Sequence, residues 1–395
     1  MKRYFVDLHV HIGRTHKGKP VKITAARNMT LTSILQSARF PKGLDMVGVI
    51  DCHSPEVLEE MEQLLERGSL LEMPGGGLRY EGDVTLIPGC EMEVQDEHCQ
   101  GPIHVLAYFP DMLAIKEFSS WLSQRVTNVQ LSTQRMYEQA HVLQRKVKSL
   151  EGIFIPAHVF TPFKSLYGKG VMRSMEEILL PELIDAVELG LSSNTEMADR
   201  LCELHSFTFV SNSDAHSLPK MAREYQSMQL EEPDFQALRK ALRNKGGNRI
   251  EANYGLNPYL GKYYTTTCSI CMKPADGKVC SNCGCAKLTK GVSERIQELS
   301  SECNVPPERP PYIHQVPLEF LPGLGAKTME KLYNHFGSEM NILHDVSKEA
   351  LSKVVNTELA ALIIKARDGN LKLEKGGGGK YGRVSAQQDK RPGSC

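Results

Sequence analysis

The segment Val6-Asp7-Leu8-His9-Val10-His11 ends a run of apolar residues with two histidines. Two later runs end in a similar way, at Asp51-Cys52-His53 and at Asp214-Ala215-His216. Residues two apart in a β-strand point to the same face, so the polar members of each pair project together. We therefore expect three strand ends to converge on a metal cluster.

Short runs of β-branched and apolar residues alternate with longer amphipathic stretches, such as Pro55 to Gly68, in the first part of the chain. The runs are Tyr4 to His11, Asp45 to Asp51, Val84 to Glu91, Ile103 to Phe109, Ile153 to His158, Ile184 to Leu189 and Phe207 to Ser211. This alternation predicts an α/β fold with a parallel sheet or barrel, and the number of strands favours a closed barrel. The short connection between the third and fourth runs is more typical of a hairpin than of a crossover.

Further candidate ligands lie at the ends of other runs. Glu91 ends the third run, His104 begins the fourth, His158 ends the fifth, and His16 lies in the loop after the first. A lone histidine is more often a hydrogen-bonded core residue, but here histidines recur at strand ends with carboxylate partners. The candidates exceed what one tetrahedral ion needs, so we expect a multinuclear site in which Glu91 bridges two ions.

This series of ligands resembles the polymerase-and-histidinol-phosphatase (PHP) family of metal-dependent phosphoesterases. The matching residues, within about residues 3–220, are His9, His11, Asp51, His53, Glu91, His104, His158, Asp214 and His216. The resemblance implies a distorted seven-stranded (β/α) barrel and a trinuclear centre of Zn, Mn, Mg or Fe that hydrolyses phosphate esters by attack of a metal-activated water. His16 is the nearest candidate for the third metal, and the candidate catalytic residues are Glu91, Asp214, His53 and His216.

The composition does not by itself indicate a partner. Lys and Arg together number 47, as do Asp and Glu, so the formal net charge is zero and bulk electrostatics indicates neither a nucleic-acid nor a membrane partner. Met1-Lys2-Arg3 leads directly into a strand and not into a secretory signal, and no stretch approaches the roughly 20 apolar residues that cross a bilayer. We expect a cytoplasmic protein.

Cysteines cluster in one short segment. Cys268 and Cys271 form one pair with two residues between them, and Cys280 and Cys283 form a second. Two such pairs predict a closed, structural zinc site, with Cys285 an alternative ligand. In a chain without a secretion signal, clustered cysteines favour a metal over disulfides.

A glycine-containing turn, Gly323-Leu324-Gly325, precedes an amphipathic helix that begins near Lys327. The segment resembles a helix-hairpin-helix DNA-binding motif, whose turn offers backbone N–H groups to phosphates, and Lys327 and Lys331 would add charge. The alternative is an ordinary helical turn with glycines. We expect a metal-dependent hydrolase domain at 1–250, a linker and zinc module at 251–300, an all-α helix-hairpin-helix domain at 312–373, and a disordered tail at 374–395.

The order of these modules resembles the endonuclease Q family of DNA-repair nucleases. The resemblance implies cleavage of double- or single-stranded DNA on the 5′ side of uracil, hypoxanthine or xanthine, with abasic sites as a further candidate, by a protein associated with the nucleoid when on DNA. Two other readings remain open. One is a PHP-type phosphatase or 3′-5′ exonuclease that uses the C-terminal modules for docking, and the other is a DNA-binding scaffold with a vestigial barrel.

Loops after the metal-bearing strands hold the candidates for reading a base. Aromatic and small polar side chains there are candidates for stacking on a flipped base or bonding to it, and lysines for pairing with backbone phosphates. The pocket candidates are Phe160, Phe163, Tyr167, Ser192, Ser193 and Asn194, and the lysines are Lys164 and Lys169. Ordinary loop packing is an equally good explanation for each of them.

Overall fold

The computed structural model describes residues 1–395 except 262, 276, 302–304, 372, 375–382 and 385–395. Each of the seven predicted runs contains a strand. These strands are β1 (Lys2–Val10), β2 (Met46–Val49), β5 (Val84–Val94), β6 (Ile103–Tyr108), β8 (Ile153–Pro156), β9 (Val187–Glu188) and β10 (Phe209–Val210). The predicted hairpin is confirmed, because β5 and β6 pair antiparallel with Glu91 opposite Leu106. The fold is mixed α/β.

Eleven strands form one mixed sheet that positions the strand ends. Its main path runs β15-β12-β11-β1-β2-β5-β4-β3, and β6, β7 and β8 continue it from β5. The additional strands are β3 (Leu70–Glu72), β4 (Leu78–Tyr80), β7 (Arg135–Met136), β11 (Tyr225–Leu230), β12 (Arg249–Gly255) and β15 (Tyr312–His314). Because β1, β2 and β5 are parallel neighbours, their carboxyl ends lie at one edge of the sheet.

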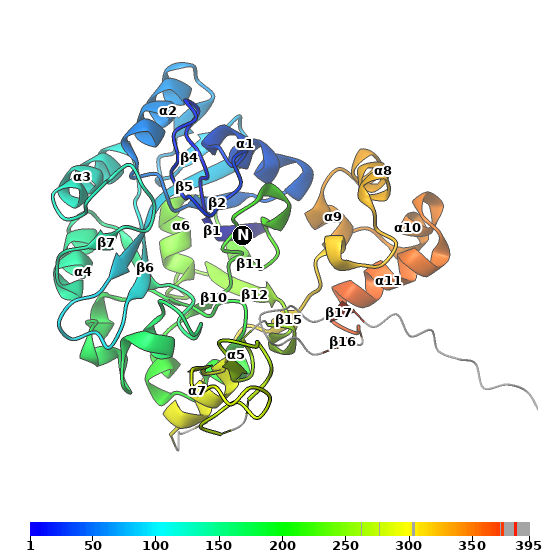
Figure 1. The fold of residues 1–395 in the computed structure, drawn as a ribbon. Helices are drawn as coiled ribbons and strands as arrows, with labels where there is room; N and C mark the ends of the chain where they lie inside the picture. The colour runs from blue at the N-terminus through cyan, green and yellow to red at the C-terminus, as the bar shows by residue number, and fades with distance from the viewer. Residues whose placement is uncertain (262, 276, 302–304, 372, 375–382, 385–395) are drawn as a thin grey trace, which may run out of the picture.

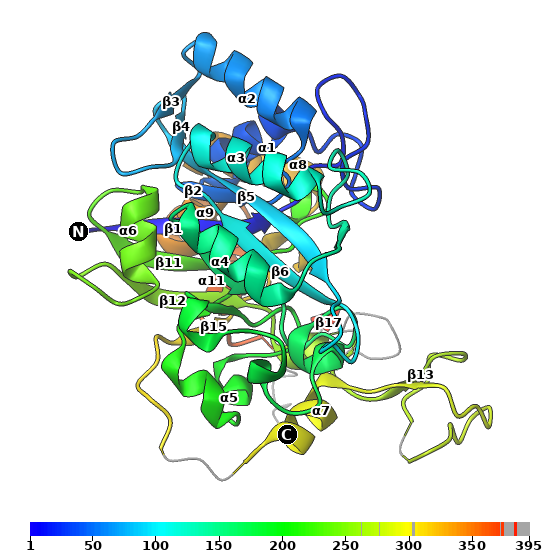
Figure 2. The same cartoon turned by 90° about the vertical axis from the view of Figure 1, so that its left-hand side faces the viewer.

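Helices surround this sheet (Figures 1 and 2). They are α1 (Leu31–Ser37), α2 (Pro55–Glu66), α3 (Met112–Ser123), α4 (Ala140–Ser149), α5 (Thr195–Ala198) and α6 (Phe235–Ala241). The carboxylate of Asp111 accepts a hydrogen bond from the N–H of Ala114 and so caps α3, which is the usual device for starting a helix. Both faces of β1 are covered, because Val6 and Leu8 pack in one apolar cluster while Phe5, on the opposite face, packs in another.

The four-cysteine segment is inserted between two neighbouring strands. It contains the antiparallel pair β13 (Thr267–Cys268) and β14 (Leu288–Thr289) and the helix α7 (Val292–Leu299). The chain then returns to the sheet, where Asn253 of β12 pairs in parallel with Tyr312 of β15. Figure 2 shows the loop around β13 projecting from the body. Strand β12 also crosses the predicted boundary at residue 250.

Four helices form a lobe beside the sheet (Figure 1). They are α8 (Ala326–Phe336), α9 (Glu339–His344), α10 (Lys348–Val354) and α11 (Thr357–Arg367). The lobe contacts the body through α9. Glu339 pairs with Lys42 at 2.8 Å, and the ring of His344 stacks on Phe5 with 4.4 Å between centroids. Most of the predicted tail lies outside the described residues, and no helix among those described is long and apolar enough to span a membrane.

Candidate metal centre

The end of β1 supplies the first group of ligand atoms. His9 and His11 are fully buried, and the Nε2 atom of each has no hydrogen-bond partner. The Oδ1 atom of Asp214, in the loop after β10, lies 3.5 Å from both Nε2 atoms. Buried imidazole nitrogens are normally satisfied, so two unpaired ones facing a carboxylate indicate that a metal ion belongs between them.

A second group lies next to the first. His104 of β6 places Nδ1 2.9 Å from Oε1 of Glu91, and His158, which follows β8, places Nε2 3.5 Å from the same oxygen. The other carboxylate oxygen of Glu91, Oε2, lies 3.4 Å from Nε2 of His11. The two oxygens of Glu91 thus face the two groups, as the predicted bridging carboxylate would.

The distances fit metal ions. Two ligands about 2.1 Å from a tetrahedral ion are roughly 3.4 Å apart, which is close to most of the separations in both groups. His158 (φ 32°) and Asp214 (φ 46°) adopt a left-handed backbone conformation that non-glycine residues rarely take. Strain of this kind is typical of functional positions, where surrounding contacts hold the side chain in place.

Carboxylates behind the ligands orient the two histidines of β1. Oε1 of Glu188 lies 3.0 Å from Nδ1 of His9, and Oδ2 of Asp51 lies 3.0 Å from Nδ1 of His11. Each contact turns the ring so that Nε2 faces the centre, as carboxylate partners of metal-binding histidines do. Asp51, a predicted ligand, therefore supports His11, while its Oδ1 atom has no hydrogen-bond partner. Glu188 was not predicted as a site residue, although a carboxylate inside the apolar run from Ile184 to Leu189 is a signal for one.

The remaining predicted ligands belong to neither group. Nδ1 of His16 lies 3.4 Å from Oε2 of Glu60 in α2, which turns it toward that helix. His53 is buried, and its Nδ1 atom has no hydrogen-bond partner. The ring of His216 lies 4.5 Å from that of His11, and its Nδ1 lies 3.5 Å from Oδ1 of Asp214.

The charged groups of the centre shift one another's pKa values. Burial would raise the pKa of Glu91, but His104 and the Lys22 ammonium group hold it well below its ordinary value. Burial likewise favours the neutral form of His9, yet the carboxylates of Glu188 and Asp214 raise its pKa to about 10. The carboxylates therefore create a strong attraction for cations at this point, and a metal ion would compete with a proton for His9.

Sequence reasoning missed Lys22. Its ammonium nitrogen lies 3.0 Å from Oε2 of Glu91 and 2.5 Å from Oγ1 of Thr133. The side chain of Lys22 is only 14% exposed. The loop after β1 contains three lysines, Lys17, Lys19 and Lys22, and no sequence pattern distinguishes Lys22 from the other two. Only the folded structure identifies it.

A cavity of about 280 Å³ opens onto the two groups. Its outer wall consists of residues from the loops after β8 and β9 and from the segment after β12: Thr161, Phe163, Lys164, Leu191, Ser192 and Tyr263. The rings of Phe163 and Tyr263 meet edge to face at 5.2 Å between centroids. The Lys164 ammonium group lies 2.8 Å from Oε2 of Glu93, at the rim.

The predicted base-reading residues divide into two sets. Phe163 and Ser192 line the cavity. Phe160 and Tyr167 are buried and stack on each other at 5.3 Å, and Ser193 donates to the carbonyl of Leu189, so packing occupies these three side chains. Asn194 caps α5 by accepting from the N–H of Met197 at 3.0 Å.

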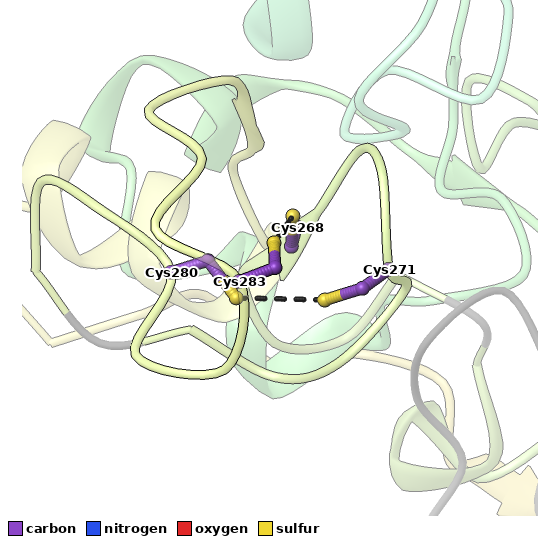
Figure 3. Close-up of side chains that lie close together, drawn as sticks. All are labelled: Cys268, Cys271, Cys280 and Cys283. Carbon is purple, nitrogen blue, oxygen red and sulfur yellow. Dashed lines mark hydrogen bonds between the residues drawn. The ribbon is translucent and has the colours of Figure 1, made fainter.

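The four cysteines converge as the spacing predicts (Figure 3). The sulfur of Cys268 lies 3.5 Å from that of Cys283, and the sulfur of Cys271 lies 3.5 Å from that of Cys280. All four sulfur atoms lie within 4.8 Å of one another, which matches one tetrahedral zinc site. Cys285 is outside the group, and its sulfur accepts from the N–H of Lys287.

The predicted DNA-contacting residues lie at the surface, away from the cavity, except for Lys164. Gly323 has φ 87°, which favours glycine, and Gly325 is the N-terminal cap of α8. Lys327 and Lys331 line a shallow depression on α8, where Lys331 also donates to the carbonyl of Val354 at 2.5 Å. Lys169 lines a groove between the loop after β8 and the four-cysteine segment, together with Lys287 and Lys290.

Comparison with known proteins adds independent evidence. No protein-family model matches the chain. The uncharacterised protein YqxK of Bacillus subtilis (strain 168) is 51% identical over 386 residues, covering 97% of this chain and 100% of that protein. The lesion-specific endonuclease PfuEndoQ from Pyrococcus furiosus matches with a TM-score of 0.80 at 31% identity, covering 97% of this chain and 95% of that one. Endonuclease Q in complex with a 27-mer duplex substrate, with an abasic lesion at the active site, matches with a TM-score of 0.81 at 31% identity, covering 98% and 97%.

Proposed function

The chain belongs to the endonuclease Q family, and from this membership we propose that it is a metal-dependent DNA-repair endonuclease. Its substrates would be DNA strands that contain uracil, hypoxanthine or xanthine, with abasic sites as a further substrate. The bond hydrolysed would be the phosphodiester on the 5′ side of the lesion. The observation that carries this proposal is the pair of ligand groups that share Glu91 at the base of an open cavity.

The finer fold assignment belongs to the same proposal. We infer that residues 1–250 form a distorted seven-stranded barrel of the PHP type, supported by the seven predicted strands, five of which (β1, β5, β6, β8 and β10) carry the grouped ligands or lead into them. Residues 312–373 would hold a helix-hairpin-helix domain, supported by the glycine turn before α8. The four-cysteine segment between them would be a zinc module.

The arrangement suits hydrolysis of a phosphate ester. Bound divalent ions would supply a water of lowered pKa and positive charge for the phosphate oxygens. His9, His11 and Asp214 would hold one ion, and His104, His158 and Glu91 the other. Glu188 and Asp51 hold the imidazole rings of His9 and His11 with Nε2 toward the centre, which orients two of the ligands in advance.

Selection of a deaminated base follows from hydrogen bonding. Deamination replaces an amino donor with a carbonyl acceptor and adds a ring N–H, so a pocket that presents one donor and one acceptor would pair with uracil and hypoxanthine alike. Cytosine and adenine would leave those buried groups unpaired, at a cost of about 1–3 kcal/mol for each. The base must leave the duplex to be read in this way. Phe163, Tyr263 and Ser192 are the side chains at the cavity that would meet it.

The test is cleavage of end-labelled duplexes that are identical except for one uracil, one hypoxanthine, one abasic site or no lesion, with Mg, Mn or Zn supplied. We expect one metal-dependent cut immediately 5′ of each lesion and none in the undamaged duplex. Release of mononucleotides from all duplexes would instead identify an exonuclease, and release of phosphate alone would identify a phosphatase.

A further inference from the structure

The turn that carries Asp214 is an irregular part of the candidate metal centre. His9 and His11 of the same ligand group lie at the end of β1, whereas Asp214 lies in the loop after β10 with φ 46°. Non-glycine residues rarely adopt this left-handed conformation, and they keep it where the surrounding structure holds the backbone in place. Contacts to the peptide groups on either side of Asp214 should therefore decide where its carboxylate lies.

The C-terminal side of this turn is paired with β1. The N–H of Ala215 donates to the carbonyl of His9, and the N–H of His11 donates to the carbonyl of Ala215, each at 3.1 Å. These bonds place Ala215 beside the strand that carries the two histidine ligands. They do not reach the peptide group between Ser213 and Asp214, which other contacts must fix.

Asp7 fixes the N-terminal side of the turn. Its side chain shares a face of β1 with the two histidine ligands, one step further from the strand end. Asp7 is fully buried and belongs to neither ligand group. Its Oδ1 atom accepts from the N–H of Ser213 at 3.1 Å, and its Oδ2 atom accepts from the N–H of Ala222 at 2.9 Å. One carboxylate therefore holds both ends of the loop that carries Asp214.

Arg223 fixes the carbonyl groups on both sides of the Asp214 α-carbon. This residue directly follows Ala222 and is 9% exposed. Its Nε atom donates to the carbonyl of Ser213 at 2.7 Å, and its Nη2 atom donates to the carbonyl of Asp214 at 3.4 Å. Each carbonyl belongs to a planar peptide group next to that α-carbon, so holding both planes restricts both backbone torsion angles of Asp214.

We propose that Asp7 and Arg223 are positioning residues that hold Asp214 in the conformation of a metal ligand. Both act through the peptide groups on either side of Asp214 and not as ligands themselves. The inference concerns how the chain holds a ligand atom. It rests on the proposed function only for the expectation that weaker metal binding lowers DNA cleavage.

The first test measures backbone hydrogen exchange in the full chain without metal or DNA. Arg223→Met removes two donors to the turn, so exchange in a peptide that covers residues 211–216 should become about 5-fold faster or more. Arg223→Lys keeps the charge but replaces the planar fork with one ammonium group, so it should show a smaller rise, and it serves if Arg223→Met fails to fold. Lys220→Met, in the same segment, is the matched control and should exchange as wild type. Wild-type exchange in both Arg223 variants would overturn the proposal.

The second test measures the affinity for Mn²⁺ by titration of the metal-free protein. In Asp7→Asn the side chain keeps its size, but only one of its two terminal atoms accepts, so the N–H of Ser213 or that of Ala222 must face an NH₂ group. We expect the affinity to fall by about 10- to 100-fold, as it does when other partners of metal ligands are lost. Asp45→Asn is the matched control, because Asp45 also accepts from a backbone N–H of β1, that of Phe5 at 2.7 Å. Equal affinity in the two variants would contradict the role of Asp7.

A double-mutant cycle shows whether Asp7 acts through Asp214. Oδ1 of Asp7 also accepts from the N–H of His9 at 3.4 Å, so a loss of affinity by itself does not identify the route. In the Asp214→Ala background, which lacks the ligand atom, Asp7→Asn should change the Mn²⁺ affinity by less than about 2-fold. A loss as large as in the wild-type background would refute the proposal, because Asp7 would then act through the strand.

The two proposals fail in different ways. Wild-type hydrogen exchange and Mn²⁺ affinity in the Asp7 and Arg223 variants would remove the positioning role and leave the endonuclease proposal intact. The expected changes in a protein that cuts no lesion-bearing duplex would remove the proposed substrate and leave the positioning role standing.

Discussion

Glu188 shows that residues behind the ligands shape this centre. Its carboxylate contacts Nδ1 of His9 and accepts hydrogen bonds from the N–H of His158 at 2.8 Å and from the side-chain amide of Asn212 at 2.7 Å. One buried carboxylate therefore positions a ligand from each of the two groups. Burial would raise the pKa of Glu188, but His9 lowers it, so the carboxylate stays charged.

Replacing Glu188 with Gln should weaken metal binding without removing a ligand. The amide keeps the shape of the side chain but orients His9 poorly, and loss of such a partner typically lowers metal affinity by about 10- to 100-fold. Titration of the metal-free protein with Mn²⁺, followed by electron paramagnetic resonance, measures this. The control is Glu182→Gln, an exposed carboxylate that precedes the same strand. Equal affinity in both variants would contradict the orienting role.

Replacing Asp214 with Asn should abolish cleavage and leave DNA binding largely intact. The substitution removes a charged ligand from the first group but leaves the surface lysines and the C-terminal helices unchanged. Cleavage and fluorescence anisotropy on the same uracil-bearing duplex separate the two effects. Full activity in this variant would show that the ligand group containing Asp214 is not the active centre.

Most candidate ligands could be predicted because they recur in a readable pattern. His9, His11 and Asp214 follow apolar runs with the period of a strand, so their convergence follows from the parallel strand ends. Lys22 lies in a loop where no period applies. The place of Phe160 and Tyr167 in a loop after a metal-bearing strand predicts pocket residues, yet the structure packs their rings against each other. Burial of a loop side chain depends on tertiary contacts that one sequence does not reveal.

At the level of elements, the sequence patterns do not predict strands β11 and β12, because both contain polar residues. Strands β11 and β12 bury Gln226, Ser227 and Asn253, and the side-chain amides of Gln226 and Asn253 donate to the carbonyls of Val6 and Phe209. Alternation of apolar and polar residues is therefore weak in both strands, and no run was recognised. The seven predicted strands are mostly buried on both sides and read as nearly continuous apolar runs.

The four-cysteine element offers a separate prediction. Replacing Cys268 and Cys271 with Ser should lower the zinc content by about one ion per chain and unfold the module, because such small units depend on their metal. Affinity for lesion-bearing duplex should fall, as measured by anisotropy. Cys285→Ser is the matched control, since its sulfur lies outside the group of four. Normal affinity in the double variant would show that the module is not needed for binding.

At the level of the whole molecule, His344 joins the C-terminal helices to the sheet. Its ring stacks on Phe5, and its Nε2 atom lies 2.7 Å from the hydroxyl of Tyr225. Burial and the nearby positive charge of Arg3 lower the pKa of His344 to about 4, although Asp345 opposes this shift. The neutral imidazole is therefore the form that fits the contact.

Because of His344, the free energy of unfolding of the protein should depend on pH. His344 has a lower pKa in the folded protein than its ordinary value of 6.5, so the unfolded chain binds more protons between pH 6.5 and about 4. Stability is therefore lost as pH falls through that window, by roughly 2 kcal/mol from about pH 7 to about pH 5. Thermal unfolding at several pH values should show a weaker dependence in His344→Gln than in the wild-type protein. His98→Gln, at an exposed site, should behave as wild type. An unchanged dependence in His344→Gln would contradict the assignment.

The return of the chain to the sheet at β15 has a practical consequence for truncation. A chain ended at residue 300 would lack β15, and would leave unpaired the backbone groups of residues 253–255 in β12 that face it. A chain ended at residue 250 would lose most of β12 as well, and would leave the edge of β11 unpaired. An exposed edge of this kind can pair with another molecule and promote aggregation. The edge of the hydrolase body is therefore protected by residues that come after the cysteine module. A chain shortened to an independent catalytic unit should be prone to aggregation.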